Sequence, residues 1–240
     1  MKKLLVNNLS KFIQGKIILQ DIDLCFESNK IYGLIGNNGA GKTTFFRTIT
    51  GLTSYSGVIT VYDGQEHFSK LNYILKHVGI VIPFPEKYDS FSVNEVFEEH
   101  LFYMGVNENV DLIELLNYVD LNISLKTKIS ELSLGMKQKL NIAIALSHRP
   151  DILLLDEPFN GLDRTGISKL KGIIKEFRKS NKVVIISSHS FRELDDIIDS
   201  VVVLDNGKVM STDDISSFPS KNIGNIEEYF EIVKMGGHNG

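Results

Sequence analysis

The sequence predicts an α/β fold with a mainly parallel sheet and a helical lobe inserted into it. Two short apolar runs, residues 152–155 and 183–186, have the pattern of parallel strands that are covered on both faces. Residues 84–147, by contrast, contain no convincing strand and at least three helical patterns. A chain of 240 residues is long enough for one such domain with a smaller lobe.

The first element of the core is a strand that runs into a glycine-rich loop. Residues 30–35 are predicted to form a buried strand, and a helix is expected from about residue 42 to residue 50, closed by Gly51. Further along, a helical pattern separates the two apolar runs. Its apolar face consists of Ile167, Leu170, Ile173, Ile174 and Phe177. Strand, helix and strand in this order predict a βαβ crossover.

The inserted lobe begins with a well-marked helix start. Ser92 and Glu95 fit a capping box, in which each side chain satisfies a backbone N–H group of the other residue. Apolar residues then follow at helical spacing as far as Met104. A second helix is expected at about residues 111–119, and a third begins near Leu134.

These patterns predict one domain over residues 1–215. Its core is expected to consist of residues 1–83 and 148–215, and its helical lobe of about residues 84–147. Residues 216–240 are expected to form a short C-terminal helix and a flexible tail, because the last five residues include no apolar side chain to bury.

Composition excludes several classes of function. The chain has 26 basic and 30 acidic residues and a net charge of -4, so nucleic acid is not an expected partner. The single cysteine, Cys25, can form no internal disulfide, which fits a reducing cytoplasm. The apolar stretch behind Lys2 and Lys3 is too short for a secretory signal, and no apolar run approaches the ~20 residues that span a bilayer. Any membrane role is therefore expected to come through a partner.

The loop between the first strand and helix matches the phosphate-loop pattern G-x-x-x-x-G-K-[S/T]. Its residues are Gly36, Asn37, Asn38, Gly39, Ala40, Gly41, Lys42 and Thr43, followed by Thr44. Glycines let backbone N–H groups turn inward around phosphate oxygens, and the helix start adds its positive dipole. Lys42 is expected to offset β- and γ-phosphate charge, and Thr43 to ligate Mg²⁺. A glycine-rich turn with a solvated lysine is the weaker alternative, because the loop sits between a predicted strand and helix.

A pair of carboxylates follows the apolar run at residues 152–155. Asp156 and Glu157 would lie at the carboxyl edge of the sheet, where ligands of α/β proteins bind. Asp156 is expected to hold Mg²⁺ through its water shell, and Glu157 to polarise the water that attacks the γ-phosphate. Alone, both could be turn residues before Pro158, but beside a phosphate loop that alternative is weak.

With these motifs, the chain resembles the nucleotide-binding subunit of an ATP-binding cassette (ABC) transporter over residues 2–215. Residues 132–138 are similar to the family signature, 161–163 to the D-loop and 187–189 to the switch histidine region. The resemblance implies a P-loop NTPase core with a mainly parallel sheet, an N-terminal antiparallel β-subdomain and an inserted helical lobe. It also implies that the chain binds ATP and Mg²⁺ and hydrolyses ATP to ADP and phosphate, coupled to transport.

The resemblance implies further site residues. Ser133 and Gly135 open a helix whose N–H groups can bind an anion, and in the family this anion is the γ-phosphate of ATP held by the opposite subunit. Without the family, Ser133 would be an ordinary N-cap. His189 is expected to act with Glu157 in catalysis by donating a hydrogen bond to the γ-phosphate or the attacking water. Asp163 would lie at the interface between the two subunits.

Several positions depart from the family pattern, among them Phe159, where a small or hydroxyl residue commonly follows Glu-Pro. The family has an adenine-stacking aromatic residue where the alignment places Ile13, and the neighbouring Phe12 is the favoured candidate while Ile13 stays open. Pro83 stands in place of a glutamine that contacts Mg²⁺ and the attacking water, and what replaces that glutamine is open. Leu134 replaces a glycine of the signature.

The predicted function is that of an ATP-hydrolysing subunit on the cytoplasmic face of the membrane, which powers a separate integral membrane permease. A second nucleotide-binding subunit is expected, in a homodimer or a heterodimer across two ATP molecules. The brief lobe and the form of the signature resemble exporters, while the cargo and the direction of transport stay open. A non-transport ABC ATPase is a weaker alternative, because such proteins have tandem cassettes or coiled-coil insertions. A GTP switch is weaker still, because its Asn-Lys-x-Asp motif is incomplete at residues 181–184.

One surface is predicted to contact the permease. Phe84, Tyr88 and Phe91 lie in an irregular, proline-containing segment and are expected to be exposed in a groove between the core and the lobe, near the helix that starts at Ser92. A cytoplasmic coupling helix of the permease would dock there. The alternative is that Phe91 belongs to the core.

Overall fold

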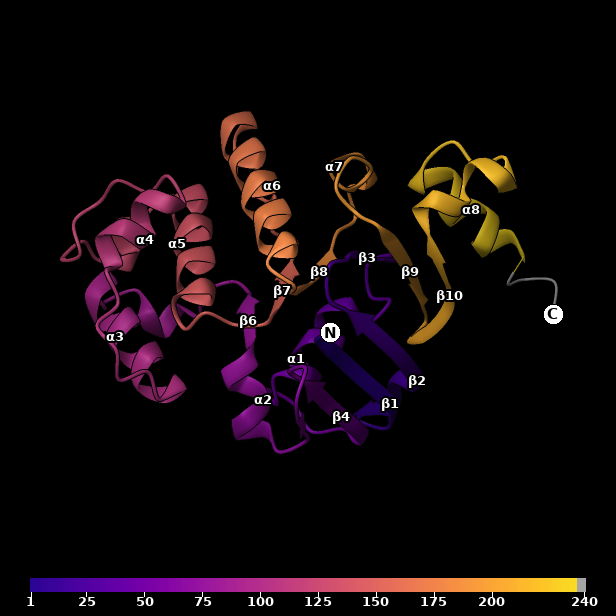
Figure 1. Cartoon of the computed structure of the whole chain (residues 1–240), viewed down its shortest axis with the longest axis horizontal. Helices are drawn as coiled ribbons and strands as arrows, with labels where there is room; N and C mark the ends of the chain where they lie inside the picture. Colours follow the sequence, from indigo (N-terminus) through magenta and orange to yellow (C-terminus); the bar gives the residue numbers. More distant parts are fainter. Residues whose placement is uncertain (237–240) are drawn as a thin grey trace.

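The computed structural model describes residues 1–236, apart from the side chain of Glu86. Two sheets lie at the centre of the molecule, and a lobe of three helices lies to one side of them (Figure 1). The expected C-terminal helix is present as α8 (Ile226–Gly236). The expected flexible tail at 237–240 lies outside the described residues.

The larger sheet has six strands in the order β10-β9-β3-β8-β7-β6. Their bounds are β3 (Ile31–Ile35), β6 (Val78–Val81), β7 (Ile152–Asp156), β8 (Val183–Ser187), β9 (Ser200–Asp205) and β10 (Lys208–Asp214). Neighbouring strands run parallel, except that β10 pairs antiparallel with β9 at one edge. The prediction of an α/β fold with a mainly parallel sheet is therefore confirmed.

The smaller sheet is antiparallel, in the order β2-β1-β4-β5. Its strands are β1 (Lys3–Ile13), β2 (Lys16–Glu27), β4 (Ser56–Tyr62) and β5 (His67–Phe68). The N-terminal antiparallel sheet that the family resemblance implied is confirmed. It packs on α1 (Lys42–Ile49) and on the larger sheet through a core that contains Phe26, Phe45 and Phe46.

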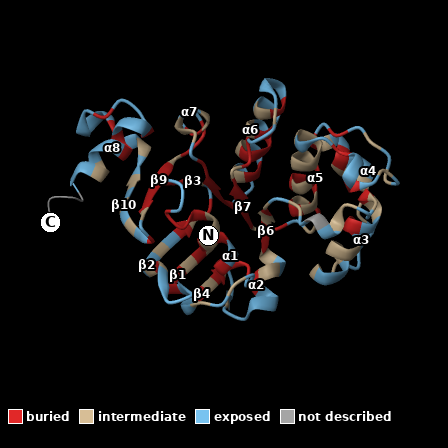
Figure 2. Ribbon diagram, turned by 180° about the vertical axis from the view of Figure 1, so that it is seen from behind, coloured by how far each residue is buried: buried red, intermediate tan, exposed pale blue. Residues whose placement is uncertain are grey.

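The larger sheet is covered on both faces, which explains its continuous apolar strands. Leu153 and Leu155 of β7 belong to the core that includes the helical lobe and α6 (Arg164–Lys179). Ile152 and Leu154 belong to the core shared with the N-terminal sheet. Because successive side chains of a strand point to opposite faces, a strand between two cores is apolar at every position. Figure 2 shows these strands in red as the most buried part of the fold.

The helical lobe lies between β6 and β7 in the chain. It contains α3 (Val93–Met104), α4 (Leu112–Tyr118) and α5 (Leu134–Ser147), with short 3-10 turns at Glu86–Tyr88 and Ile129–Glu131. The expected capping box starts α3, because the Ser92 N–H donates to Glu95 Oε2 at 2.7 Å and Ser92 Oγ accepts from the Glu95 N–H at 3.3 Å. The three predicted helices are thus confirmed.

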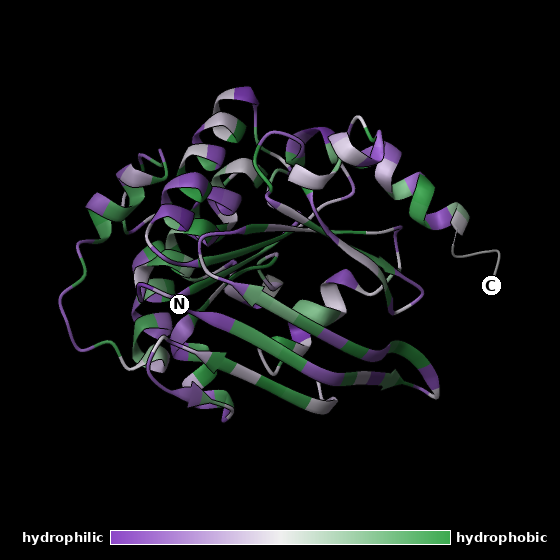
Figure 3. Ribbon diagram, turned by 45° about the vertical axis from the view of Figure 1, so that its right-hand side comes forward, coloured by the Kyte–Doolittle hydropathy of each residue, from purple (hydrophilic) through white to green (hydrophobic). Residues whose placement is uncertain are grey.

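Several short elements were not predicted from the sequence. These are α2 (Leu71–His77), α7 (Phe191–Leu194) and the 3-10 turns at Ile215–Ser217 and Pro219–Lys221. The α2 helix has no side-chain cap and buries only Ile74, so its periodicity is weak. In Figure 3 the strands are mainly apolar while the helices mix apolar and polar positions. Within residues 1–236, no helix combines the length and apolar character that crossing a bilayer requires.

Candidate functional site

The phosphate loop lies between β3 and α1, and close packing of its backbone requires glycine. A Cβ atom at Gly36 would lie 2.1 Å from the carbonyl oxygen of Leu204, at the end of β9. Gly41 has a φ of 109°, and a Cβ atom there would lie 2.8 Å from Leu19 of β2. Gly39 also has a positive φ, but no atom lies within 4 Å of its Cβ position. The loop is therefore packed on its inner side and open at its crest.

Lys42 is the first residue of α1, and its side chain is buried beneath the loop. Its ammonium group donates to the carbonyl oxygens of Gly36 at 2.7 Å and Asn37 at 3.2 Å. Burial lowers the pKa of the Lys42 ammonium, while the nearby Glu157 and Asp156 carboxylates oppose that shift. A desolvated cation held only by carbonyl dipoles can receive an anion without first giving up an ion pair.

The other residues of the phosphate loop differ in their exposure to solvent. The exposed residues are Asn37, Asn38 and Gly39. Ala40 is buried, and its carbonyl oxygen accepts from the Gly207 N–H at 3.0 Å. Thr43 and Thr44 are half-buried in the first turn of α1, where no side chain caps the helix. The free N–H groups of this turn can therefore bind phosphate oxygens.

Asp156 ends β7 at the carboxyl edge of the sheet. Its side chain is 8% exposed, and Ser187 Oγ donates a hydrogen bond to Asp156 Oδ1. Ser187 was not predicted to take part in the site, although it belongs to the region that resembles the switch histidine. The register of β7 against β8 places Asp156 opposite Ser187, and a sequence reading of two parallel strands does not fix that register. Ser187 thus fixes the orientation of the carboxylate.

Glu157 and His189 form a hydrogen-bonded pair next to Asp156. Glu157 has a positive φ of 48°, and its N–H donates to the Ser187 carbonyl at 3.1 Å. Its Oε2 atom lies 2.8 Å from Nδ1 of His189. A carboxylate can only accept, so Nδ1 carries the proton and donates this hydrogen bond to Glu157. The His189 side chain is 56% exposed and the Glu157 side chain 24%, so both are accessible.

The oxygens at this edge fit Mg²⁺ that is bound together with phosphate. The Thr43 hydroxyl and the Asp156 carboxylate are hard oxygen donors, and Mg²⁺ is usually held by one or two protein ligands plus substrate phosphates and waters. Across residues 1–236, no cluster of three or more His, Cys, Asp or Glu side chains could hold a metal without help. Any Mg²⁺ here would therefore depend on substrate oxygens.

The signature and D-loop residues form a second hollow of about 600 Å³. Ser133 caps α5 and Asp163 caps α6. Gly135 packs so closely that a Cβ atom there would lie 2.7 Å from the carbonyl oxygen of Gly161. Leu134 is largely exposed at the same surface. None of residues 36–44 lines this hollow, so the signature residues and the phosphate loop form two separate groups in the described chain.

The two candidates for adenine stacking lie at the end of the β1–β2 hairpin. The side chains of Phe12 and Ile13 are 57% and 44% exposed, and Phe12 is paired with Ile17 of β2. The hairpin approaches the phosphate loop because Leu19, further along β2, packs against Gly41. Phe12 as the stacking residue stays a prediction, with Ile13 as its alternative.

Pro83 follows β6 and is exposed. The preceding carbonyl, of Ile82, accepts a hydrogen bond from the Asn141 side-chain amide at 3.0 Å. This amide belongs to α5, so it fixes the segment after β6 to the helical lobe. Pro83 itself offers no donor toward the carboxyl edge, as expected from its ring.

The aromatic segment after Pro83 is less exposed than predicted. Phe84 and Tyr88 are half-buried, because they pack against the core of the lobe with their rings 6.2 Å apart. Phe91 is 36% exposed and its ring lies 5.4 Å from that of Tyr88. The expectation that Phe84 and Tyr88 are exposed is therefore wrong, and the alternative that Phe91 belongs to the core is wrong as well.

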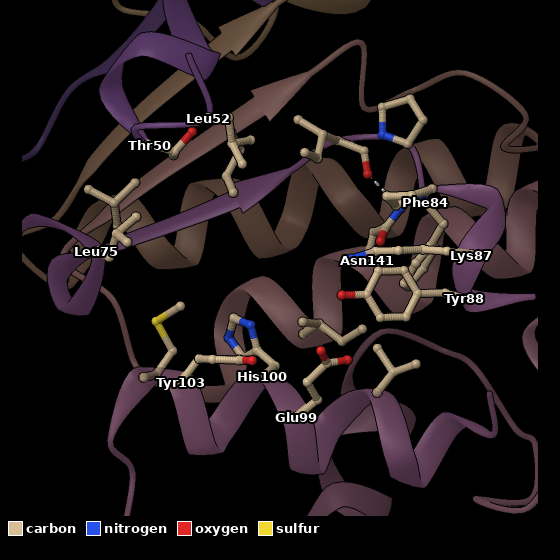
Figure 4. A pocket seen from close by; sticks show the side chains of 18 residues that line it. Thr50, Leu52, Leu75, Phe84, Lys87, Tyr88, Glu99, His100, Tyr103 and Asn141 are labelled. Atoms are coloured by element: carbon tan, nitrogen blue, oxygen red, sulfur yellow. Dashed lines mark hydrogen bonds between the residues drawn. The ribbon is translucent and has the colours of Figure 1, made fainter. Parts of the chain in front are cut away.

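Phe84 and Tyr88 line a groove of about 440 Å³ between β6 and α3, which Figure 4 shows from close by. Glu99 and His100 of α3 also line it, and neither was singled out in the sequence. They follow the capping box as ordinary residues of an amphipathic helix, so no local pattern marks them. Only the fold brings them opposite the segment after β6.

Comparison with known proteins gives consistent results. The family described as ABC transporter matches residues 19–160. The lantibiotic transport ATP-binding protein SrtF of Streptococcus pyogenes is 36% identical over 85% of this chain and 88% of that protein. The bacitracin transport ATP-binding protein BcrA of Bacillus licheniformis is 34% identical over 85% of this chain and 67% of that protein.

Solved structures agree with the sequence relatives. An ATP-binding subunit of an ABC transporter superposes with a TM-score of 0.82 at 25% identity, covering 96% of this chain and 99% of that one. The ADP conformation of the ATP-binding cassette MJ1267 superposes with a TM-score of 0.72 at 21% identity, over 95% of this chain and 98% of that one. The second likeness concerns the fold alone.

Proposed function

This chain belongs to the ABC transporter family as an ATP-binding subunit, and we propose that it hydrolyses ATP to power a separate integral membrane permease that exports its cargo. The observation that carries the proposal is that the phosphate loop with the buried Lys42 follows β3 while Asp156 and Glu157 lie at the end of β7, at the same carboxyl edge of the sheet. The chain would lie on the cytoplasmic face of the membrane, held there by the permease.

ATP binding uses the open crest of the phosphate loop. The loop and the first turn of α1 offer free N–H groups, and Lys42 exchanges its carbonyl partners for β- and γ-phosphate oxygens. Thr43 and Asp156 would hold Mg²⁺, which would offset the charge of the phosphate oxygens. Phe12 stacks on the adenine, with Ile13 as the alternative support.

Hydrolysis depends on Glu157. Its carboxylate accepts a hydrogen bond from a water and takes the proton as the water oxygen attacks the γ-phosphorus and the bond to ADP breaks. His189 holds Glu157 through Nδ1, so Nε2 of the neutral ring can only accept a hydrogen bond. Donation from Nε2 to the γ-phosphate therefore requires the protonated ring.

Two subunits complete the site. Ser133 and Gly135 lie in a hollow separate from the phosphate loop, so they cannot reach ATP bound to the same chain in this arrangement. A second subunit, placed with its signature over this phosphate loop, supplies the missing N–H groups to the γ-phosphate. Asp163, which lines the same hollow, would then lie at the subunit interface.

Two of the relatives support the role in transport. Their names refer to transport of a lantibiotic and of bacitracin, and both are ATP-binding proteins. We propose that the permease of this chain contacts the groove lined by Phe84 and Tyr88, through a cytoplasmic coupling helix. The groove is partly apolar and bordered by the exposed Phe91, as a protein contact would require.

The Lys42→Ala variant tests ATP binding. Without the ammonium, the loop cannot offset the triphosphate charge, so ATP affinity should fall severely and hydrolysis should be lost. Titration calorimetry and phosphate release measure the two effects. Arg47→Ala, on the same helix and exposed, is the matched control and should retain both. Wild-type affinity in Lys42→Ala would refute the assignment of the site.

A further inference from the structure

The groove between β6 and α3 contains a carboxylate that has no partner. Glu99 lies one turn before the end of α3 and points into the groove (Figure 4). Its Oε2 atom is shielded from solvent and accepts no hydrogen bond. Among the side chains that the structure describes, no lysine, arginine or histidine forms an ion pair with Glu99. It is the single buried side-chain oxygen or nitrogen of this kind in the described chain.

Three other polar side chains of the groove have contacts of their own. His100 Nε2 lies 3.0 Å from Nδ1 of His148. The amide of Asn141 donates to the Ile82 carbonyl, and the ammonium of Lys87 lies 4.8 Å from the centre of the Tyr88 ring. The remaining walls are mainly apolar. Glu99 Oε2 is therefore the buried polar atom of this groove that has no hydrogen-bond partner among the described residues.

A desolvated carboxylate oxygen without a hydrogen bond is costly, because it has given up water and gained nothing. A carboxylate is only an acceptor, so whatever satisfies it must bring a donor, and a cationic donor satisfies it best. Water could fill an open groove, but it would leave the apolar walls exposed. A basic side chain covers them as well, because its aliphatic stem packs on apolar surface while its charged end reaches the acceptor.

The rim of the groove extends this apolar surface. Tyr103 lines the groove from α3 and is 71% exposed, and the adjacent Phe102 is 79% exposed. Their rings are 5.7 Å apart. Phe84 and Tyr88 line the same groove as Tyr103 and Glu99, from the segment after β6. A segment that docks here would meet aromatic walls and one central negative charge.

We propose, on the basis of the function proposed above, that the docking segment of the permease carries a lysine or arginine that pairs with Glu99. The partner segment is an amphipathic helix whose apolar side chains contact Phe84, Tyr88 and Tyr103. Its basic side chain enters between them and reaches Oε2 of Glu99. The pair would be formed only in the assembled transporter, so Glu99 is a specificity residue for the permease rather than part of the ATPase site.

The test uses the permease that co-purifies with the tagged wild-type chain and is identified by mass spectrometry. The permease is immobilised in detergent, and binding of the wild-type chain is compared with binding of Glu99→Gln and of Glu98→Gln. Glu98 is the matched control, because it is exposed on α3 and does not line the groove. Glu99→Gln keeps the shape and removes the charge, so its dissociation constant should rise on the order of a hundredfold. Glu98→Gln should bind like the wild type.

A second pair of measurements separates partner recognition from a structural role. In the isolated chain, Glu99→Met replaces an unmet carboxylate by an apolar side chain of similar length, so it should raise the melting temperature while weakening permease binding. If Glu99 only supported the fold, Glu99→Met would lower the melting temperature instead. Glu99→Lys should abolish binding, and reversal of one basic residue in a cytoplasmic helix of the permease to glutamate should restore it.

The possible results distinguish this inference from the function on which it rests. Wild-type affinity of Glu99→Gln, with binding still lost on replacing Phe84 and Tyr88 by serine, overturns the ion pair and leaves the docking site in place. If a second copy of the chain, rather than a membrane protein, is the partner whose binding depends on Glu99, the inference is also overturned. If no membrane protein co-purifies with the wild-type chain, the proposed function itself fails.

Discussion

The phosphate-binding edge of the central sheet and the groove beside α3 are built in opposite ways. At the edge, each charged group has a partner within the chain: Asp156 accepts from Ser187, and Glu157 accepts from His189. In the groove, Glu99 has no partner and the aromatic walls are only half-buried. The edge offers groups that can bind a small ligand, whereas the groove is the surface that we propose another protein fills.

The phosphate loop and the groove also differ in how many separate segments of the chain form them. The phosphate loop is one continuous segment, and its glycines are fixed by contacts with β2 and β9. The groove combines the segment after β6 with α3 and α5, which lie in two parts of the fold. Changes at the edge should therefore act mainly on ATP binding and hydrolysis, and changes in the groove mainly on permease binding.

The largest effect is expected for Glu157→Gln. The amide cannot take the proton of the attacking water, so turnover should fall by about 10²–10⁴-fold. Nucleotide affinity should change little, because Glu157 is not among the groups that bind the phosphates. The measurements are phosphate release for turnover and calorimetry for affinity.

The trapped state gives a second readout of the same variant. With ATP bound but not hydrolysed, Glu157→Gln should accumulate as a dimer in size-exclusion chromatography. Lys42→Ala should remain monomeric under the same conditions, because it does not retain ATP. Hydrolysis at the wild-type rate in Glu157→Gln would contradict the catalytic assignment.

The edge could be predicted from the sequence more completely than the groove. The phosphate loop and the carboxylates after β7 are local patterns, because each motif must follow a strand directly to work. Ser187 was missed as a partner of Asp156, because the pairing depends on strand register. Glu99 and its surroundings could not be predicted, because burial of a helix residue depends on which distant segment packs over it. The short α2 helix was missed since weak periodicity carries little signal.

The groove should respond to loss of its aromatic walls. Replacing Phe84 and Tyr88 together by serine removes the apolar surface that a docking helix would cover, so co-purification of the permease should be lost. ATP affinity should remain, because neither side chain contributes to the phosphate edge. Tyr73→Ser is the matched control, since Tyr73 is an exposed aromatic residue of α2 outside the groove. Unchanged co-purification in the double variant would rule out this docking surface.

A histidine pair joins the groove to the central sheet and makes stability depend on pH. His148 Nε2 lies 3.2 Å from the Val78 carbonyl, which can only accept, so His148 carries its proton on Nε2. Nδ1 of His148 is then an acceptor, and His100 Nε2 donates to it at 3.0 Å. Protonating His148 would put a proton on the Nδ1 atom that accepts this hydrogen bond, and protonating His100 would place a positive charge beside a buried ring. Burial, and for His100 also the neighbouring His148, lowers the pKa of both rings to about 4.

The pH dependence follows from the sign of these shifts. Both folded-state pKa values lie below the ordinary value of about 6.5, so the unfolded chain binds more protons between pH 6.5 and pH 4. Stability is therefore full above pH 6.5 and is lost as the pH falls toward 4. Denaturant unfolding at pH 5 should show a free energy lower than at pH 7.5 by about 2–4 kcal/mol. His100→Gln should remove about half of this difference, and an undiminished difference would count against the assignment.

The smallest effect is expected where the edge departs from its family. Pro83 replaces a glutamine that would contact Mg²⁺ and the attacking water, yet Lys42, Asp156, Glu157 and His189 remain in place. Loss of one positioning contact costs on the order of tenfold to a few hundredfold in rate. The wild-type chain is therefore expected to be a slow but active ATPase, with a water in place of the glutamine amide.

Pro83→Gln tests how far the edge and the groove are independent. Pro83 lines the groove and directly follows Ile82, whose carbonyl accepts from Asn141. The substitution should leave ATP affinity nearly unchanged and should raise, or at least not lower, the basal hydrolysis rate. Because it returns an N–H group to an exposed position, it should not disturb the hydrogen bond from Asn141. If hydrolysis and permease binding both fell, the segment after β6 would couple the phosphate-binding edge to the groove, and the two regions would not be independent. Absence of turnover in the wild-type chain, even with its permease present, would instead show that the proline leaves the site catalytically inactive.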